Sequence, residues 1–511
     1  MKERKRNSYE LRESEKRIWK KEEQKELNRK ERREVKREEK RREKKKREVN
    51  KEFARVTYLF VALFLVLMVY VGYYDVVKGQ EIINSPYNPR LDSMADRVVR
   101  GKILDKDGNV LAETENADDG SEYRYYPYGD LYAHVVGYST QGKSGLESSQ
   151  NFELLTSNAF FLEKLQKEFQ DEKNIGDNVV TTLDSNLQQA AYNALGDNKG
   201  AVVILSPSTG KILAMVSKPS YDPNAVLENW DALNSDPDSS LLNRATLGQY
   251  APGSTFKIVT ALEYMREHSD YENYGYDCIG EINYNGITIP CAGHTAHGQV
   301  NLADSFAYSC NSSFCNIGLQ LNISKYRDTA EELLFNTTLP ADLPYSKSQF
   351  RLSGKDSDAQ RMMTAMGQGE TQVSPYHMAL ITSAIANGGT LMRPYLVSAV
   401  TNYNGTVIKE ETPEKYTDLM TAQEASILKT YMQGVTSYGT GSVMSGEAYT
   451  VAGKTGTAEY SSESSDKNHS WFVGFTNVDN PELVISVIVE ESDGNTKAVN
   501  VAKEIFDNYY Y

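Results

Sequence analysis

The sequence predicts an α+β fold, in which helices flank a sheet that is assembled from distant parts of the chain. Apolar, strand-like runs with turn residues between them occur at both ends of the folded part, at residues 179–184, 200–205, 211–216, 471–475 and 483–491. Long helical patterns fill the block between these two groups. Strands that surround a central helical block in this way indicate one α+β domain. An uncharged run at 56–74 precedes it.

The composition is that of a folded chain with two oppositely charged parts. Of its 511 residues 40% are hydrophobic and 25% are charged, and the length indicates about three domains. Residues 1–55 contain 25 Lys/Arg against 14 Asp/Glu, whereas residues 56–511 contain 31 against 56. This acidic body argues against binding to nucleic acid.

Residues 56–74 are predicted to form a single transmembrane helix. These 19 residues carry no charge and would span about 28 Å as a helix, close to the hydrocarbon thickness of a bilayer. A buried core helix, which is the alternative, rarely lacks polar residues on every face. No small-residue cleavage site follows, so we expect an uncleaved anchor.

The flanks of this run predict its orientation. The twenty residues before it contain 11 Lys/Arg, and the twenty after it contain two. The positive-inside rule then assigns residues 1–55 to a basic cytoplasmic tail and everything after Asp75 to the outer side of the cell membrane.

The extracytoplasmic part is expected to hold two domains. Residues 75–178 contain short strand-like pieces and turns, such as the Asp107-Gly108-Asn109 turn and an extended segment at 134–138, and predict a small β-rich module. Residues 179–511 form the larger domain. It begins with a strand and a helix at 185–195 that Asp184 is placed to cap.

A first chemical motif lies in Pro252-Gly253-Ser254-Thr255-Phe256-Lys257. Pro and Gly before a helical pattern place Ser254 at a helix N-terminus. Lys257 is three residues on and lies on the same face, so its amine can reach the Ser254 hydroxyl. A desolvated, neutral lysine can activate a serine nucleophile, although this short motif also occurs by chance.

A second motif, Ser309-Cys310-Asn311, follows 55 residues downstream, just before a helical run. Serine can relay a proton, and asparagine can both donate to and accept from a substrate amide. Alone, so short a motif is not specific.

A third motif, Lys454-Thr455-Gly456-Thr457, lies in a strand-like segment. In a strand Lys454 and Gly456 share one face. We expect Gly456 to let a ligand backbone approach the strand and Lys454 to offer its charge to a carboxylate. A glycine-rich turn is the alternative for the isolated tetrad.

The three motifs together, in this order and at these separations, resemble the penicillin-recognising serine enzymes. Longer stretches such as AVVILSPSTGKILAMVSKPSYDPN and GQGETQVSPYHMALITSAIANGG strengthen the resemblance to class B penicillin-binding proteins. The short region before residue 178, with RYYPYGDLYAHVVGYSTQGKSGLE, is similar to the compact penicillin-binding protein A type. The resemblance implies a penicillin-binding, serine β-lactamase-like transpeptidase domain at 179–511.

This resemblance implies a role for each motif residue. Ser254 would attack the penultimate D-Ala carbonyl of a stem peptide, and Lys257 would be its general base. Ser309 would pass the proton to the leaving amine, and Asn311 would hold the substrate amide. The substrate-binding residues would be Lys454, Thr455, Gly456 and Thr457, with the threonines and Lys454 at the terminal carboxylate. Backbone N–H groups of Ser254 and Thr457 would form the oxyanion hole.

The implied function is a peptidoglycan D,D-transpeptidase that cross-links stem peptides and is acylated by β-lactams. It needs no cofactor, and its possible partner is a glycosyltransferase of the wall-synthesis machinery. A D,D-carboxypeptidase or a β-lactamase is the alternative within the same fold. A β-lactam sensor or a scaffold is the alternative from another class.

Four cysteines leave a further question open. Cys278, Cys291, His294 and His297 have spacings that a zinc site could use, but a Cys278–Cys291 disulfide is at least as compatible with an extracytoplasmic domain. We expect no metal. Cys310 and Cys315 are interpreted as small core residues.

Overall fold

The computed structural model describes residues 2–74, 94–459, 468–492, 494 and 496–511. The chain divides into two units, residues 1–82 and 83–511. Residues 75–93, the start of the expected small module, lie outside the described residues.

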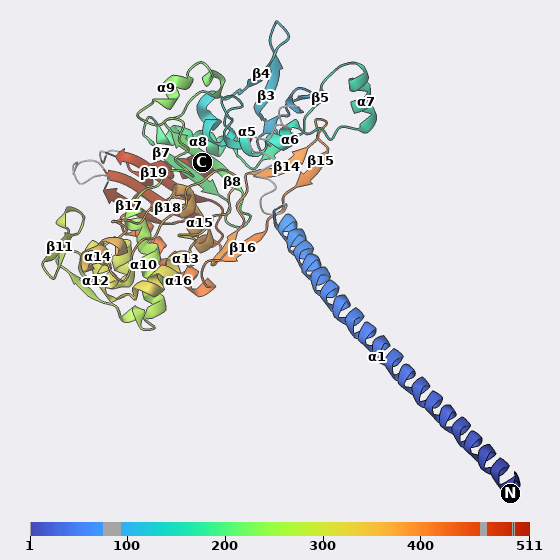
Figure 1. Cartoon of the computed structure of the whole chain (residues 1–511). Coiled ribbons are helices and arrows are strands. Elements are labelled where there is room, and N and C mark those ends of the chain that lie inside the picture. Colours follow the sequence, from blue (N-terminus) through green and yellow to red (C-terminus); the bar gives the residue numbers. More distant parts are fainter. Residues whose placement is uncertain (1, 75–93, 460–467, 493, 495) are drawn as a thin grey trace. The chain divides into compact units, whose positions relative to one another are not determined.

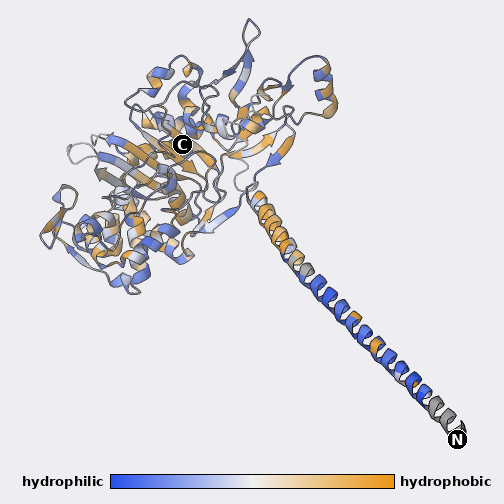
Figure 2. Cartoon of the chain, viewed as in Figure 1, coloured by the Kyte–Doolittle hydropathy of each residue, from blue (hydrophilic) through white to orange (hydrophobic). Residues whose placement is uncertain are grey.

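The described part of the first unit contains one long helix, α1 (Lys2–Tyr73). Its apolar residues gather at the C-terminal end, whereas the rest of the helix is hydrophilic (Figure 2). Within the described part of the chain, one helix is long and apolar enough to cross a membrane, and it is this one. Its apolar side chains are exposed, as at Leu63 with 63% of its surface accessible. The sequence prediction of a helix over 56–74 is confirmed.

The second unit is built on a five-stranded antiparallel sheet with the strand order β17-β18-β19-β7-β8 (Figure 1). The strands are β17 (Val451–Glu459), β18 (Asn468–Thr476), β19 (Val484–Ser492), β7 (Gly200–Leu205) and β8 (Ile212–Lys218). The C-terminal strand β19 therefore pairs with β7, which lies almost 300 residues earlier. This arrangement confirms the prediction of a sheet that joins distant segments.

Alternating side chains of this sheet enter two separate cores. Val202 and Ile204 of β7 pack with α8 (Ser185–Leu195) and α17 (Ala498–Tyr510). Val203 and Leu205 point the other way, into a core that includes α15 (Pro375–Ala386). Because successive side chains of a strand point to opposite faces, the sheet has an apolar surface on each face, and helices cover both. Asp184 caps α8 as predicted, because its carboxylate accepts from two backbone N–H groups.

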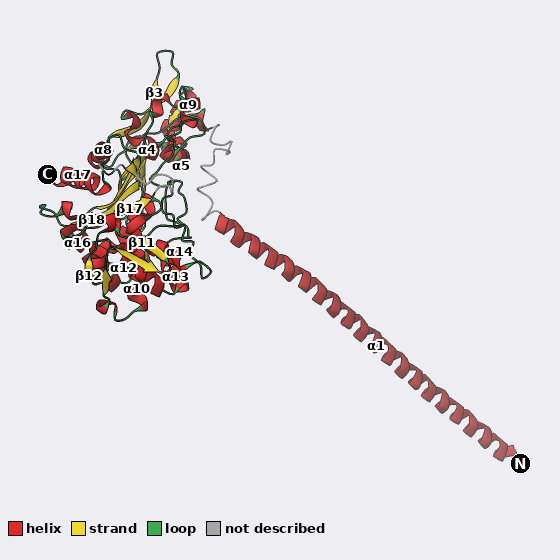
Figure 3. Cartoon of the chain, turned by 90° about the vertical axis from the view of Figure 1, so that its left-hand side faces the viewer, coloured by secondary structure: helices red, strands yellow, loops and turns green. Residues whose placement is uncertain are grey.

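Most of the helices between β8 and β17 gather together (Figures 1 and 3). They are α10 (Lys257–Glu267), α11 (Leu302–Ala307), α12 (Asn311–Gln320), α13 (Ile323–Glu332), α14 (Asp358–Ala365) and α16 (Ala422–Ser437). Two small antiparallel pairs accompany them, β9 (Tyr276–Cys278) with β12 (Gly298–Val300) and β10 (Glu281–Tyr284) with β11 (Ile287–Pro290).

A second sheet has the strand order β15-β14-β6-β2-β3-β4. Its strands are β15 (Val407–Glu410), β14 (Val397–Thr401), β6 (Asn178–Thr181), β2 (Ile103–Leu104), β3 (Val110–Asn116) and β4 (Glu122–Tyr125). It therefore joins strands from both sides of residue 178. The remaining elements are β1 (Val98–Val99), α4 (Ala133–Val136), α5 (Gly145–Ser149), α6 (Asn151–Leu155), α7 (Phe161–Phe169), β5 (Asn174–Ile175), α9 (Trp230–Asn234), β13 (Thr390–Met392) and β16 (Lys415–Asp418).

One local prediction was wrong. The segment 134–138 was expected to be extended, but α4 forms there, and Gly137 N–H closes its turn on the carbonyl of Ala133. Two adjacent valines favour a strand when they lie on a half-buried surface. Here Val135 and Val136 are buried completely, so tertiary packing decides the conformation.

A buried ion cluster ties this region together. Glu147 is fully buried and accepts from the Nε atoms of Arg100 and Arg124, at 2.5 and 2.7 Å. Burial acts to raise the pKa of Glu147, but the two arginines outweigh it and hold the carboxyl below its ordinary value. Such a cluster fixes the arrangement of its elements because any member left alone would be an unpaired buried charge.

Candidate active site

Ser254 lies in a 3-10 turn, η4 (Gly253–Phe256), and α10 begins three residues later at Lys257. The Lys257 side chain is fully buried, while Ser254 is half-buried. Lys257 Nζ lies 3.0 Å from Ser254 Oγ. The predicted contact between these two residues, and the position of Ser254 at a helix N-terminus, are confirmed.

Ser309 and Asn311 meet the same amine from the turn between α11 and α12. Lys257 Nζ donates to the Ser309 carbonyl and to Asn311 Oδ1, both at 2.8 Å, and lies 3.1 Å from Ser309 Oγ. Ser309 has a left-handed backbone with φ of 56°. That conformation is unfavourable for a residue with a Cβ and turns both of its oxygens toward the lysine.

The third motif lies in β17, with its side chains alternating between two faces. Lys454 is fully buried, and its Nζ donates to Ser309 Oγ at 3.0 Å and to the Thr455 carbonyl at 3.1 Å. Thr455 is half-buried and Thr457 exposed. Thr455 Oγ1 also lies 2.5 Å from Thr440 Oγ1. The lysine therefore lies beneath the strand, and the threonines lie on the opposite face.

Gly456 shares the face of Lys454, as the pattern predicted, but this face packs against the protein. A Cβ on Gly456 would lie 3.0 Å from the side chains of Thr255 and Trp471. The missing side chain thus lets β17 pack closely against the turn of Ser254. Gly253 makes the reciprocal approach: its φ is 53°, and a Cβ there would lie 2.5 Å from the Thr457 carbonyl. Both glycines bring the first and third motifs together.

The two lysines share Ser309 Oγ in a site that disfavours positive charge. Burial lowers the pKa of Lys257 to about 8. Burial, and after it the charge of Lys257, lowers the pKa of Lys454 well below its ordinary value. Their hydrogen bonds connect Ser254, Lys257, Ser309 and Lys454 in one chain. A proton can move along such a chain without leaving the protein.

A cavity of about 970 Å³ opens above this chain of hydrogen bonds. Six of the eight predicted site residues line it, namely Ser254, Ser309, Asn311, Thr455, Gly456 and Thr457. Lys257 and Lys454 lie beneath them. The described residues that line it include no Asp or Glu.

Sequence reasoning missed several cavity residues, among them Thr440 and Gln368. Thr440 contacts Thr455, and Gln368 Nε2 donates to the Thr457 carbonyl at 3.3 Å. Gln368 lies in one of the stretches that resemble the family, so the signal was present. No sequence motif marks Thr440, because only the folding of the chain brings this residue next to β17.

The cysteines do not form the disulfide that was one alternative, and their cluster has a different fourth member from the one that the spacing suggested. All four are free, and Cys278 Sγ lies 3.7 Å from Cys291 Sγ, so no disulfide joins them. His294 is exposed, whereas His297 Nδ1 lies 3.3 Å from Cys278 Sγ. Cys310 lies in this group as well. Cys315 is a core residue against Met362 and Met366, as expected.

Comparison with known families agrees with this geometry. Residues 200–510 match the penicillin binding protein transpeptidase domain, and residues 100–179 match the penicillin binding protein A dimerisation domain. The chain therefore belongs to the penicillin-binding proteins with a transpeptidase domain, and the resemblance to class B is confirmed.

The similar proteins include penicillin-binding protein A of other bacteria. The peptidoglycan D,D-transpeptidase PbpA of Mycolicibacterium smegmatis is 33% identical over 435 residues, which cover 79% of this chain and 86% of the relative. A D,D-transpeptidase domain from Eggerthella lenta is 32% identical with a TM-score of 0.72, covering 81% of this chain and 98% of that one. Penicillin-binding protein A of Mycobacterium tuberculosis, solved as an imipenem acyl-enzyme complex, is 28% identical with a TM-score of 0.72, covering 80% and 98%.

Proposed function

We propose that this chain is a serine-type peptidoglycan D,D-transpeptidase that β-lactams acylate. The observation that carries the proposal is the continuous chain of hydrogen bonds from Ser254 through Lys257 and Ser309 to Lys454. A nucleophile needs a base within hydrogen-bond reach that is itself held by further groups, and this arrangement supplies both. The relatives named as D,D-transpeptidases and the acyl-enzyme complexes support the same conclusion.

Lys257 is the general base in this proposal. A neutral amine has two N–H bonds and one lone pair. The Ser309 carbonyl and Asn311 Oδ1 can only accept, and each lies 2.8 Å from Lys257 Nζ, so they take both N–H bonds. The lone pair is then left for a hydroxyl proton, and the hydroxyls of Ser254 at 3.0 Å and Ser309 at 3.1 Å can each donate to it in turn.

In the acylation step Ser254 Oγ forms a bond to the penultimate D-Ala carbonyl carbon, and its proton moves to Lys257 Nζ. Backbone N–H groups of Ser254 and Thr457 stabilise the oxyanion. The C–N bond to the terminal D-Ala then breaks, and Ser309 passes a proton to the leaving amine. The amine of a second stem peptide attacks the ester, which forms the cross-link and restores Ser254.

The terminal carboxylate of the substrate, which a β-lactam mimics, lies at Thr455 and Thr457. Both line the cavity, and no acidic side chain among its described residues opposes an anion. Lys454 acts from below the strand, where its Nζ donates to Ser309 Oγ and holds that hydroxyl in place. Asn311 holds the substrate amide.

The lack of a carboxylate among these lining residues also favours transfer over hydrolysis. A β-lactamase needs a base that activates water against the acyl-enzyme. The carboxylate of Glu332 could in principle activate water. It lies at the end of α13, however, where it forms an ion pair with Arg266 at the surface. It does not line the cavity.

The rate of acylation should rise with pH as Lys257 loses its proton. With a pKa of about 8, only about a tenth of the amine is neutral at pH 7. We expect the second-order rate constant with a fluorescent penicillin to increase about tenfold per pH unit below 8 and to level off above it. A flat profile between pH 6 and pH 9 would argue against a titrating lysine base.

The full assignment includes anchoring. We propose that residues 1–55 are cytoplasmic, that residues 56–74 span the cell membrane, and that the catalytic domain at 179–511 and the small module at 75–178 lie outside. The uncharged segment of α1 and its basic flank support this. Protease added to intact protoplasts should digest the catalytic domain and spare a tag at the N-terminus, and the reverse pattern would refute this topology.

The partner of the enzyme is proposed to be a glycosyltransferase that supplies the glycan strands. The two domains that match known families, at residues 100–179 and 200–510, are a dimerisation domain and a transpeptidase domain. We expect the full-length chain to cross-link glycan strands while a polymerase makes them, and to cross-link preformed glycan polymer far less when no polymerase is present. Equal cross-linking during and after polymerisation would contradict such a dependence.

The function is tested by giving the full-length chain in detergent a pentapeptide stem and an amine acceptor. The expected result is a cross-linked dimer together with one D-Ala released for each link formed. Release of D-Ala without a dimer would identify a carboxypeptidase instead. Absence of both products, with a folded protein, would favour a scaffold or sensor.

A further inference from the structure

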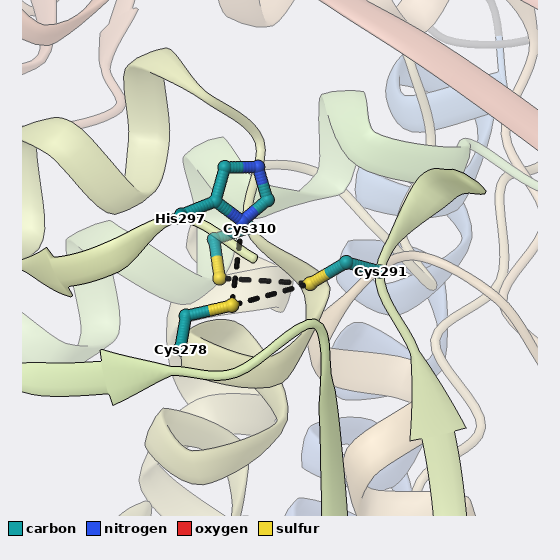
Figure 4. A group of neighbouring side chains, drawn as sticks. All are labelled: Cys278, Cys291, His297 and Cys310. Carbon is teal, nitrogen blue, oxygen red and sulfur yellow. Dashed lines mark hydrogen bonds between the residues drawn. The ribbon is translucent and has the colours of Figure 1, made fainter. Parts of the chain in front are cut away.

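Three cysteines and one histidine lie together beside the active site. Cys278, Cys291, His297 and Cys310 point toward one another from four separate segments (Figure 4). Their ligand atoms all lie within 4.8 Å of one another. The pairing of β12 with β9 places His297 next to Cys278, while Cys291 follows β11 and Cys310 precedes α12.

The distances in this cluster fit a tetrahedral metal ion. Cys278 Sγ to Cys291 Sγ is 3.7 Å, and Cys291 Sγ to Cys310 Sγ is 3.8 Å. Zinc–sulfur bonds of about 2.3 Å at tetrahedral angles separate two sulfurs by about 3.8 Å. His297 Nδ1 lies 3.3 Å from Cys278 Sγ, close to the nitrogen–sulfur edge of the same tetrahedron. Three cysteines and one histidine also form one of the ligand sets of structural zinc.

The surroundings support the ligands as well. The three cysteines are buried to 2% exposure or less. Cys310 is the N-cap of α12, where its sulfur accepts from the Ser313 N–H at 3.4 Å, and Cys291 Sγ lies 3.1 Å from the Ser312 hydroxyl. Hydrogen-bond donors of this kind orient the sulfur ligands of a metal ion.

We infer that this chain binds one structural Zn²⁺ through Cys278, Cys291, His297 and Cys310. Binding replaces the three thiol protons, which pass to solvent. Four protein ligands leave no open position, so the ion holds structure and takes no substrate. This inference replaces the expectation of no metal, and Cys310 takes the place that the spacing had given to His294.

The zinc site also has a consequence for the active site. Cys310 lies between Ser309 and Asn311, the two residues that hold Lys257. Cys291 belongs to the wall of the cavity. A metal bond at Cys310 would fix the turn in which Ser309 keeps its left-handed backbone. Zinc therefore positions the second motif. This consequence rests on the proposed function, whereas the metal site does not.

The test is the zinc content of the full-length chain, purified in detergent under reducing conditions and supplied with Zn²⁺ alone. We expect about one zinc per chain by elemental mass spectrometry after removal of free ion. Cys310→Ser and His297→Ala should lose at least most of it. Their matched controls, Cys315→Ser and His294→Ala, change the neighbouring cysteine and histidine outside the cluster and should keep it.

A second readout does not depend on how well the variants fold. Co²⁺ in place of Zn²⁺ in the unaltered chain should give the absorption of a tetrahedral ion with thiolate charge-transfer bands. Wild-type protein without bound zinc or cobalt would overturn the inference, as would equal zinc in cluster and control variants. A mass two hydrogens lower in a separate preparation purified without reductant, indicating a disulfide among these cysteines, would overturn it too. Since none of these readouts uses acylation, they stay separate from a failure of the proposed function.

Discussion

Lys257→Met is expected to lower the rate of acylation by β-lactams by about 10²- to 10⁴-fold, the usual contribution of a general base. Methionine has nearly the length of lysine and fills the same buried space, but it cannot accept the proton of Ser254. The variant should keep the fold, since the amine it removes is costly to bury. The measurement is the second-order rate constant for a fluorescent penicillin at pH 8.

The matched control is Lys429→Met. Lys429 is a half-buried lysine of α16 whose Nζ donates to the Val478 carbonyl, outside the cavity. Penicillin should acylate the Lys429→Met variant at the wild-type rate. A Lys257→Met rate within a few fold of wild type would mean that another group takes the proton, and the assignment of the base would be wrong.

Ser254→Ala is expected to remove acyl transfer altogether, because Ser254 supplies the oxygen of the acyl-enzyme ester. The other hydroxyl near Lys257 Nζ, that of Ser309, is also bound by Lys454 and serves as the proton relay. Neither D-Ala nor a cross-linked dimer should form from the stem peptide above background. The melting temperature should change little, because Ser254 is half-buried and its loss costs about one hydrogen bond. Residual turnover in a folded Ser254→Ala chain would place the nucleophile elsewhere.

Much of the fold could be predicted because its signals are local. Asp184 before an apolar helical pattern predicted the cap of α8, and the strand-like runs at 200–205 and 211–216 correspond to the paired strands β7 and β8. The sheet order followed only in outline. That β14 pairs with β6 in the second sheet depends on contacts between residues more than 200 positions apart, which no local pattern records.

The residues of the active site could be predicted from the sequence, but the direction in which their side chains point could be predicted less well. The period of a strand placed Lys454 and Gly456 on one face, but it does not say which face is buried. The structure turns this face inward, where Lys454 meets Ser309. In the same way, spacing suggested that Cys278 and Cys291 belong together. The spacing also offered both His294 and His297, and only the pairing of β9 with β12 and the start of α12 select His297 and add Cys310.

The most direct test of the central claim is the intact mass of the full-length chain after treatment with benzylpenicillin, followed by peptide mapping. The expected result is one drug mass added to each chain, located on Ser254 and absent from the folded Ser254→Ala variant. Slow loss of this adduct would agree with the lack of an acidic base among the described residues of the cavity. An adduct on a different residue, or an unmodified wild-type chain that is folded, would contradict the proposal that Ser254 is the nucleophile of a penicillin-binding transpeptidase.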